Sequence, residues 1–329
     1  MEENCGLVSE EATDLEQLMA SEILETFPRL EEVPEAIATK FREMIHFYLL
    51  TKKASPELKP FRALKHLGKV FDDKGKLVCI FKHCKEAKKE AAVYLLDHPL
   101  SLHRSKSSDL IGFGGATPTV FIRTKETSGC LVSYVENDGV VGDYTPFKFK
   151  TLPQEIHKLG IFHIRFGSTD CHNRNTVSKI DAEGIHRLTP IDHEECFNPN
   201  FNFRRVWWEE KKESKESFTP EMVNYVNKLD VDGDIRFLKT CGWDVPREIT
   251  VPFKIYTSFL KKAVQFHLTA YDMSVLARND HKSPIFNLCN MVLEYNPENT
   301  HGDELFLQNA YEKMESRLTE YARKFVKKN

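Results

Sequence analysis

Strand patterns are confined to one early stretch of this 329-residue chain, and they constrain its fold class more than any other feature. Residues 61–136 contain two hairpin signals, one around Asp72-Asp73-Lys74-Gly75 and one around Lys125-Glu126-Thr127-Ser128-Gly129. A short helical pattern from Glu86 to about Asp97 separates the two hairpins. This order predicts an antiparallel sheet with one helix packed against it.

Helical patterns flank this stretch on both sides. Before it, Thr13-Asp14-Leu15-Glu16 has the spacing of a capping box, and apolar residues through Ile23 and Leu24 follow at helical intervals. Further helices are predicted at about Pro34–Thr51, Glu221–Asn227, Pro252–Arg278 and Asp303–Phe325, with a hairpin around Asp181-Ala182-Glu183-Gly184. We therefore expect an α+β fold with a helical extension at 1–60, a small antiparallel β lobe at 61–136 and a larger, mainly helical lobe at 137–329.

Composition narrows the class of protein. Lys and Arg number 46 against 49 Asp and Glu, a net charge of −3, whereas proteins that grip a phosphate backbone usually carry an excess of cations. The eight cysteines are scattered without a C-x-x-C pair, as is typical of reduced thiols in the cytoplasm. No run approaches the roughly 18 apolar residues of a membrane span. We expect a cytoplasmic, monomeric protein that does not bind nucleic acid.

Three oxygen-bearing side chains stand in an order that suits phosphoryl transfer. Asp170 is followed five residues later by Asn175, and Asp192 comes after the intervening hairpin. Transfer from a nucleotide needs one carboxylate to accept the proton of the attacking hydroxyl, and an amide oxygen and a second carboxylate to hold magnesium. Taken alone, the D-x-x-x-x-N match more often marks a turn at a helix end that an Asp caps.

A lysine and a glutamate in the small lobe strengthen the kinase interpretation. Lys82 ends an apolar strand pattern, and Glu90 lies eight residues later on the following helix. Kinases use such a pair to hold the α- and β-phosphates of ATP. The alternative for the pair alone is a surface salt bridge of little energetic weight. The whole ordered set of strand lysine, helix glutamate, D-x-x-x-x-N and Ile-Asp favours a kinase.

Several segments resemble the phosphatidylinositol 3- and 4-kinase family and its relatives. Phe81-Lys82 with Glu90 resembles the family's lysine segment, Asp170-Cys171-His172-Asn173-Arg174-Asn175 its Asp-Arg-His-x-x-Asn loop, and Ile191-Asp192 its metal site. Leu131 to Glu136 looks like its hinge. The sequence departs from the family at Cys171, where Arg is usual, and at Glu194, where Gly is expected; the latter puts a mobile loop pivot in doubt.

The resemblance implies a bilobal protein-kinase-like fold and a role for each matching residue. Asp170 is then the catalytic base, and His172 a second group near the transferred phosphate. Asn175 and Asp192 hold Mg²⁺, with Mn²⁺ as a possible substitute. The ATP-binding residues are implied to be Lys82, Glu90, Tyr134, Val135 and Glu136, the last three through backbone groups that meet adenine.

The acceptor is predicted from the segment 198–217, which such a fold turns toward the substrate. Five cationic residues there face four acidic ones, which is little positive charge for an anionic inositol head group, and Trp207-Trp208 suggests a protein interface or simple packing. We therefore predict an atypical serine/threonine protein kinase. The chain is similar to the actin–fragmin kinases, which implies actin or an actin–fragmin complex as substrate.

Three other interpretations stay open or are disfavoured. A phosphoinositide lipid kinase is the main alternative, and a non-catalytic scaffold with a kinase fold is the second. A metal-dependent hydrolase that uses His163, Cys171, His172, Asp192 and His193 is disfavoured, because no pair of histidines has the i, i+4 spacing of a helical metal site.

Overall fold

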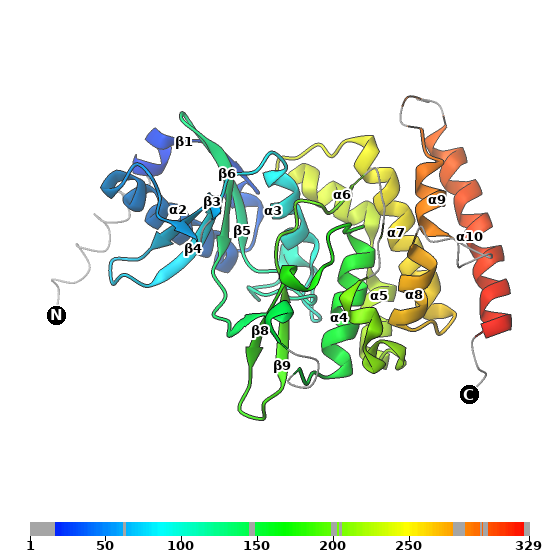
Figure 1. Cartoon of the computed structure of the whole chain (residues 1–329). Helices are drawn as coiled ribbons and strands as arrows, with labels where there is room; N and C mark the ends of the chain where they lie inside the picture. Colours follow the sequence, from blue (N-terminus) through cyan, green and yellow to red (C-terminus); the bar gives the residue numbers. More distant parts are fainter. Residues whose placement is uncertain are drawn as a thin grey trace, which may run out of the picture. The chain divides into compact units, whose positions relative to one another are not determined.

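The computed structural model describes residues 17–61, 64–144, 149–198, 203, 206–278, 287–296, 298 and 302–325. The chain forms two compact units (Figure 1). The first contains Met1–Gly112, Thr117–Val135 and Thr240–Trp243, and the second contains Phe113–Ala116, Glu136–Lys239 and Asp244–Asn329. None of the helices in the described ranges is long and apolar enough to cross a bilayer.

The first unit is built on a six-stranded antiparallel sheet with the order β1-β5-β6-β4-β3-β2. Both predicted hairpins are confirmed. The turn between β3 and β4 is made by Asp72, whose carboxylate accepts the backbone N–H groups of Lys74 and Lys76, and by Gly75 at a φ of +76°. The strands are β1 (Ile23–Phe27), β2 (Pro60–Phe61), β3 (Leu64–Phe71), β4 (Leu77–Lys82), β5 (Thr119–Thr124) and β6 (Ser128–Ser133).

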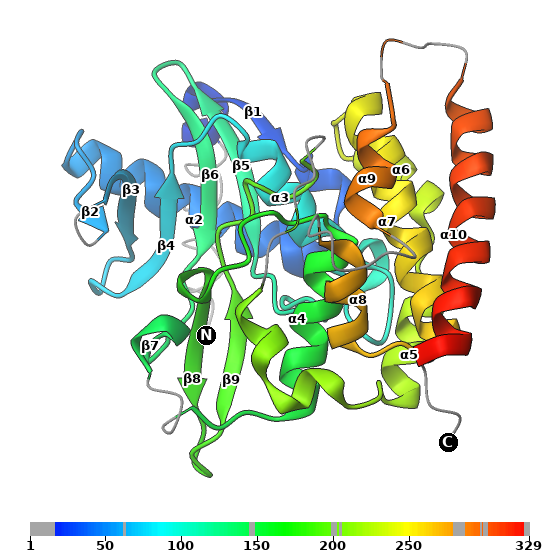
Figure 2. The same cartoon turned by 45° about the vertical axis from the view of Figure 1, so that its right-hand side comes forward.

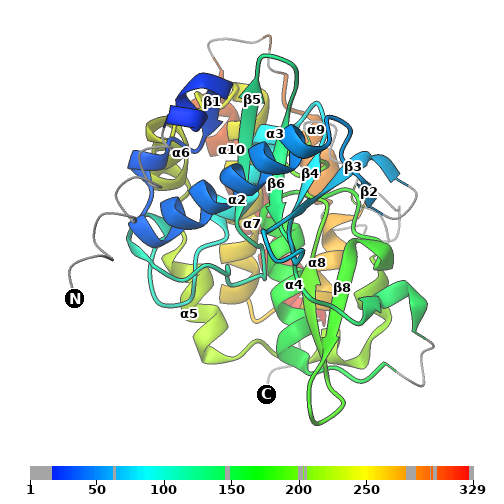
Figure 3. The same cartoon turned by 90° about the vertical axis from the view of Figure 1, so that its left-hand side faces the viewer.

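Two helices pack on this sheet. The helix α2 (Glu35–Ala54) runs across it (Figure 3), and α3 (Ala87–Leu96) packs on β5 and β6. Both helices were predicted to within a few residues. The ring of Phe41 on α2 meets that of Tyr94 on α3 edge to face, with 5.9 Å between centroids. Every residue of α3 apart from Lys88 and Lys89 is buried, so this helix is held rigidly against the sheet.

The prediction that residues 1–60 are helical is wrong for Ile23 and Leu24. Residues 17–22 are helical, and the chain then enters β1, which pairs with β5 and covers that edge of the sheet. A strand edge has unpaired backbone groups, and hydrogen bonding to them outweighs the weak helical pattern of this short run. Phe27, at the end of β1, is fully buried against Trp243. The predicted capping box at Thr13 to Glu16 lies outside the described residues.

The second unit combines a three-stranded sheet with a helical core. The strands β7 (Gly139–Val140), β8 (Thr176–Ile180) and β9 (His186–Pro190) pair in that order, which confirms the hairpin around Asp181 to Gly184. The helix α4 packs on α7 and α8, and α10 lies alongside α7 (Figure 2). The helices are α4 (Pro153–Arg165), α5 (Pro220–Lys228), α6 (Val231–Thr240), α7 (Arg247–Gln265), α8 (Ala270–Ala277), α9 (Leu288–Leu293) and α10 (Asp303–Phe325).

The single helix predicted at Pro252–Arg278 is two helices. The chain leaves α7 at Phe266, His267 takes a left-handed φ of 58°, and Thr269 starts α8 with a complete capping box to Asp272. That Thr-x-x-Asp spacing was the available signal for a new helix start. Pro252 lies inside α7 and does not begin it, because the helix already starts at Arg247 after Pro246. The bounds of α10 agree with the prediction.

Candidate functional site

The predicted site residues divide between the two units. Lys82, Glu90, Tyr134 and Val135 belong to the first unit, whereas the chain passes into the second unit at Glu136. The second unit contains the remaining residues, Asp170, His172, Asn175 and Asp192. The site residues therefore form two groups, one in each unit.

Lys82 and Glu90 form a buried ion pair in the first unit. Lys82 is the last residue of β4 and Glu90 lies in the first turn of α3; their side chains are 7% and 2% exposed. The Lys82 Nζ lies 3.4 Å from Glu90 Oε1 and 3.5 Å from Oε2. Because desolvating two charges is costly, a pair like this is poor evidence of stability and a better indication of function. The surface salt bridge considered as the alternative is excluded.

Tyr134, Val135 and Glu136 follow the end of β6. The backbone N–H of Tyr134 donates to the carbonyl of Val78 on β4, with 2.9 Å between N and O, so the sheet fixes the start of this segment. The Tyr134 ring lies 6.3 Å from that of Phe61, measured between centroids. These three residues span the point where the chain changes units, as expected of a hinge. Their contact with adenine stays a prediction.

The loop after α4 brings Asp170, His172 and Asn175 together. Asn175 Nδ2 donates to Asp170 Oδ2 at 2.9 Å and to the Asp170 carbonyl at 3.1 Å. His172 Nδ1 accepts the backbone N–H of Arg174, so its Nε2 carries the proton, and this Nε2 lies 3.4 Å from Asp170 Oδ1. The Asp170 side chain is 43% exposed. Both oxygens of an accessible carboxylate are thus oriented by neighbouring donors.

Asp192 reaches the same end of the β8–β9 hairpin as Asn175. Thr176 pairs with Pro190, and the backbone N–H of Ile191 donates to the carbonyl of Asn175 at 3.0 Å. Asp192 is exposed and has a left-handed φ of 65°. The turn takes its positive φ values at Asp192 and Phe197, so Glu194 does not stand where the backbone needs a glycine.

This donor set suits a divalent cation. Since Nδ2 of Asn175 donates to Asp170, the oxygen Oδ1 is the amide atom that can face a metal. An amide oxygen and an exposed carboxylate at one end of a hairpin are ligands that Mg²⁺ and Mn²⁺ prefer. Asn175 and Asp192 therefore fit the predicted metal role, in which the ion neutralises charge on the phosphates.

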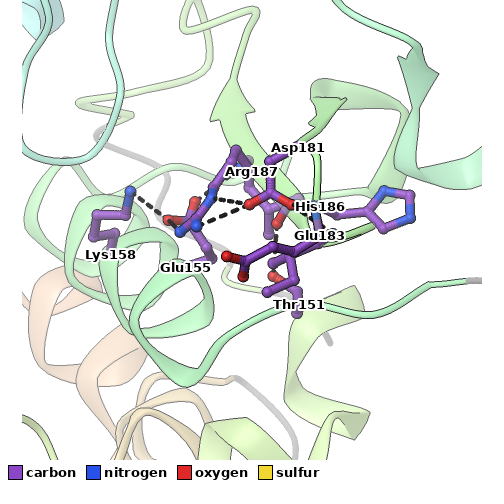
Figure 4. A network of polar contacts seen from close by, with 9 residues as sticks. Thr151, Glu155, Lys158, Asp181, Glu183, His186 and Arg187 are labelled. Atoms are coloured by element: carbon purple, nitrogen blue, oxygen red, sulfur yellow. Dashed lines mark hydrogen bonds and ion pairs between the residues drawn. The ribbon is translucent and has the colours of Figure 1, made fainter.

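A buried carboxylate on α4 supports the β8–β9 hairpin (Figure 4). Glu155 Oε2 accepts the backbone N–H of Leu188 on β9 at 2.9 Å, while Oε1 pairs with Lys158 at 3.0 Å. Arg187 adds an ion pair to Asp181 at the hairpin turn. Glu155 was not among the predicted site residues, because no local sequence pattern shows that a helix carboxylate will meet a strand far along the chain. This contact ties the hairpin next to Asn175 and Asp192 to the helix that precedes Asp170.

Gly167 allows the chain to turn from α4 into the Asp170 loop. It has a φ of +55°, and a Cβ built there would lie 2.2 Å from the Tyr256 ring. We expect Gly167→Ala to lower the free energy of unfolding by about 2–4 kcal/mol, because it combines backbone strain with overpacking. Gly184→Ala is the matched control, since Gly184 has a φ of +73° with nothing within 4 Å of the added Cβ, and we expect a loss of about 1–2 kcal/mol. Urea unfolding measures both, and equal losses would contradict the packing argument.

Cys171 and His163 do not have the surroundings of metal ligands. The Cys171 thiol donates to the carbonyl of Ser168 at 3.2 Å, and burial raises the pKa of Cys171 to about 12. His163 Nδ1 accepts the indole N–H of Trp208 at 3.0 Å, and burial lowers the pKa of His163 to about 3. Both side chains pack in the interior of the second unit. The hydrolase interpretation therefore has no support.

The segment 198–217 differs from its prediction. Trp208 is fully buried on His163 and Trp207 is partly buried, so the pair forms core packing and not an exposed protein interface. Glu209 is also buried, 2.9 Å from Arg278, and so does not offset the exposed lysines. Arg204 and Arg205 lie outside the described residues. The charge count of the accessible surface is therefore one unit more positive than the sequence count, because sequence alone does not show which carboxylates are buried.

The buried His163 makes stability depend on pH. Its folded pKa of about 3 lies below the ordinary value of 6.5, so the unfolded chain takes up a proton that the folded chain excludes. Stability is therefore lost as pH falls from 6.5 toward 3, by up to about 1.4 kcal/mol per pH unit from this residue. His163→Gln keeps an acceptor for Trp208 and removes the titration, so we expect a shallower slope. Unfolding free energies between about pH 7 and pH 4 measure it, and identical slopes would contradict the assignment.

Comparison with known proteins places this geometry in a family. Residues 87–273 match the model of the family described as phosphatidylinositol 3- and 4-kinase. Phosphatidylinositol 4-kinase gamma 2 of Arabidopsis thaliana is 35% identical over 210 residues, which cover 58% of this chain and 38% of the relative. Phosphatidylinositol 4-kinase gamma 3 of the same plant is 30% identical over 255 residues, covering 71% and 44%.

A relative in rice has a similar likeness. Phosphatidylinositol 4-kinase gamma 4 of Oryza sativa subsp. japonica is 35% identical over 199 residues, which cover 58% of this chain and 34% of the relative. The chain thus spans less than half the length of these curated relatives. The family match covers more than half of the chain and contains Glu90, the Asp170 loop and Asp192. The α+β architecture agrees with a kinase fold, and the chain belongs to the phosphatidylinositol 3- and 4-kinase family.

Proposed function

We propose that this chain is an ATP-dependent lipid kinase that transfers the γ-phosphoryl group to the 4-hydroxyl of phosphatidylinositol. The observation that carries the proposal is the Asp170 carboxylate, which is accessible yet held at one oxygen by Asn175 and at the other by His172. A carboxylate oriented in this way suits a general base. The choice of acceptor is supported by the names of the relatives, which are phosphatidylinositol 4-kinases.

Each group of residues has a role in this proposal. Asp170 accepts the proton of the inositol hydroxyl as the hydroxyl attacks the γ-phosphorus, and His172 lies beside the developing charge. Lys82, oriented by Glu90, holds phosphates of ATP. Asn175 and Asp192 hold the magnesium ion, which supplies charge neutralisation. Backbone groups of Tyr134, Val135 and Glu136 bind adenine.

A lipid acceptor now has better support than a protein acceptor. The argument for a protein depended on an exposed tryptophan pair and on a near-neutral charge count. Burial of Trp208 removes the first, and burial of Glu209 takes one negative charge from the second. Phosphatidylinositol carries one phosphodiester charge, so its recognition needs few cations. The segment offers Lys211, Lys212 and Lys215 for this, beside the acidic Glu210, Glu213 and Glu216. The resemblance to actin–fragmin kinases gains no support from relatives named as lipid kinases. A scaffold role fits poorly with a complete set of oriented catalytic residues.

The acceptor is tested by offering several substrates to one preparation. Purified chain with γ-labelled ATP and Mg²⁺ is incubated with phosphatidylinositol vesicles, phosphatidylcholine vesicles, actin, or an actin–fragmin mixture. We expect label in the lipid fraction of the phosphatidylinositol sample alone. Label on actin without label on lipid would contradict the proposal and restore the protein-kinase interpretation. Asp192→Asn should abolish transfer to any acceptor, which controls for a contaminating kinase.

A further inference from the structure

Two cysteines, Cys84 and Cys130, lie next to Lys82 in the first unit. Cys130 on β6 is the direct cross-strand partner of Lys82 on β4, and such partners project from the same face of a sheet. Cys84 follows Lys82 by two residues, just past the end of β4. Past that end the chain still runs beside β6, because His83 Nδ1 lies 2.9 Å from the carbonyl oxygen of Ser128, and a side-chain hydrogen bond with Cys84 is the largest effect that raises the pKa of Cys130. The two sulfur atoms therefore meet beside the lysine assigned to the phosphates of ATP.

The two thiols differ in access and in surroundings. Cys84 is partly exposed, whereas Cys130 is fully buried. The hydrogen bond with Cys84, burial and the Glu90 carboxylate raise the pKa of Cys130 well above its ordinary value, and the Lys82 ammonium opposes them. Both members of the ion pair are thus close enough to act on the Cys130 sulfur. A small oxidant from solvent therefore reaches the Cys84 thiol first, whereas the buried Cys130 thiol is protected from it.

We propose that Cys84 and Cys130 form a reversible redox site that controls the Lys82–Glu90 pair. A peroxide transfers one oxygen to Cys84, giving a sulfenic acid and releasing an alcohol, or water where the oxidant is hydrogen peroxide. The Cys130 sulfur then attacks that of Cys84; the S–S bond forms, the S–O bond breaks, and the hydroxide leaves as water with the Cys130 proton. The thiols lose two electrons, which reduce the peroxide, and a dithiol reductant reverses the change.

The disulfide acts on nucleotide binding through the strand that carries Lys82. Hydrogen-bonded sulfurs must approach to a bond length of about 2.05 Å, which draws the end of β4 toward the strand beside it. Lys82 adjoins both linked positions, since it lies two residues before Cys84 and directly across from Cys130. Because interiors are close-packed, the Lys82 side chain shifts relative to Glu90 when this strand end moves. This step rests on the proposed function, in which the pair holds ATP.

The test compares reduced and peroxide-treated protein. Purified full chain is treated with hydrogen peroxide, and peptide mapping with intact-mass measurement detects a Cys84–Cys130 link with the loss of two hydrogens. ATP affinity is measured by calorimetry before oxidation, after it, and after dithiothreitol. We expect the link to form, ATP affinity to fall by about tenfold, and the reductant to restore it. Cys84→Ser should keep its ATP affinity through oxidation, whereas Cys241→Ser, which removes a buried thiol of the same unit, should behave as wild type.

Three outcomes decide the inference. Oxidation that yields no Cys84–Cys130 link would overturn it, and so would a link that leaves ATP affinity unchanged. Equal sensitivity of Cys84→Ser and wild type would assign the effect to another residue and also overturn it. If reduced wild type binds no ATP, the proposed function fails instead, while the mass measurement still decides whether the two thiols form the pair.

Discussion

Replacing Asp170 with asparagine is expected to lower kcat for lipid phosphorylation by about 10²–10⁴-fold, the range for loss of a general base. Asparagine preserves the size of the side chain and still offers Asn175 an acceptor at one atom, but it does not accept the proton of the attacking hydroxyl. Lys82 and Glu90 are untouched, so ATP affinity should stay within about twofold. Initial rates on phosphatidylinositol vesicles and ATP calorimetry give the two quantities.

The matched control for this substitution is Glu183→Gln. Glu183 is an exposed carboxylate in the turn of the β8–β9 hairpin. Its substitution also replaces a carboxylate with an amide, in the same unit but away from the Asp170 loop. We expect wild-type kcat from it. A kcat for Asp170→Asn close to that of the control would remove Asp170 from the role of base. A tenfold loss of ATP affinity in Asp170→Asn would indicate a nucleotide-binding role in its place.

Breaking the Lys82–Glu90 pair is expected to have a large effect on stability as well as on binding. Glu90→Leu leaves the Lys82 ammonium buried beside an apolar side chain and should lower the free energy of unfolding by about 3–5 kcal/mol. The double variant Lys82→Met, Glu90→Leu removes both charges and should recover most of this loss, since a packed apolar pair carries no desolvation penalty. Both variants should lose ATP binding by at least tenfold.

The double variant separates structure from function. If the pair mainly stabilises the fold, the double variant stays as unstable as the single variant. A stable double variant that still binds ATP would contradict the role of the pair in phosphate binding. Urea unfolding and ATP calorimetry on the same preparations distinguish these results. The double variant Lys88→Met, Glu25→Leu serves as the control. That ion pair lies in the same unit, its atoms are 2.6 Å apart, and its side chains are 31% and 25% exposed, so its loss should leave ATP binding unchanged.

Much of the fold follows from the sequence because its signals are local. Both hairpins have turn residues at fixed offsets, and α10 has the apolar stripe that predicted its bounds. Two predictions failed because a local helical pattern was outweighed. Strand pairing outweighed it at β1, and a new helix cap outweighed it between α7 and α8. No sequence window contains the partner strand that decides the matter for Ile23 and Leu24.

The candidate site was predictable where spacing carries the chemistry. The structure joins Lys82 to Glu90 and Asp170 to Asn175 as the motif spacing implied. The acceptor was not predictable, because the surface of 198–217 depends on two distant contacts. Glu209 is buried with Arg278, and Trp208 packs on His163. Those contacts connect residues 45 and 69 positions apart, and no local pattern reports them. Glu155, which fixes the β8–β9 hairpin, was missed for the same reason.

The position of the new phosphate on the lipid product tests the central claim most directly. Phosphatidylinositol vesicles are incubated with the purified chain, Mg²⁺ and labelled ATP; the product is deacylated, and its head group is compared with phosphoinositide standards. We predict label at the 4-position, formed by wild type and lost in Asp170→Asn. Label at another hydroxyl would contradict the assigned acceptor position, and label found on protein with none on lipid would contradict the lipid-kinase account altogether.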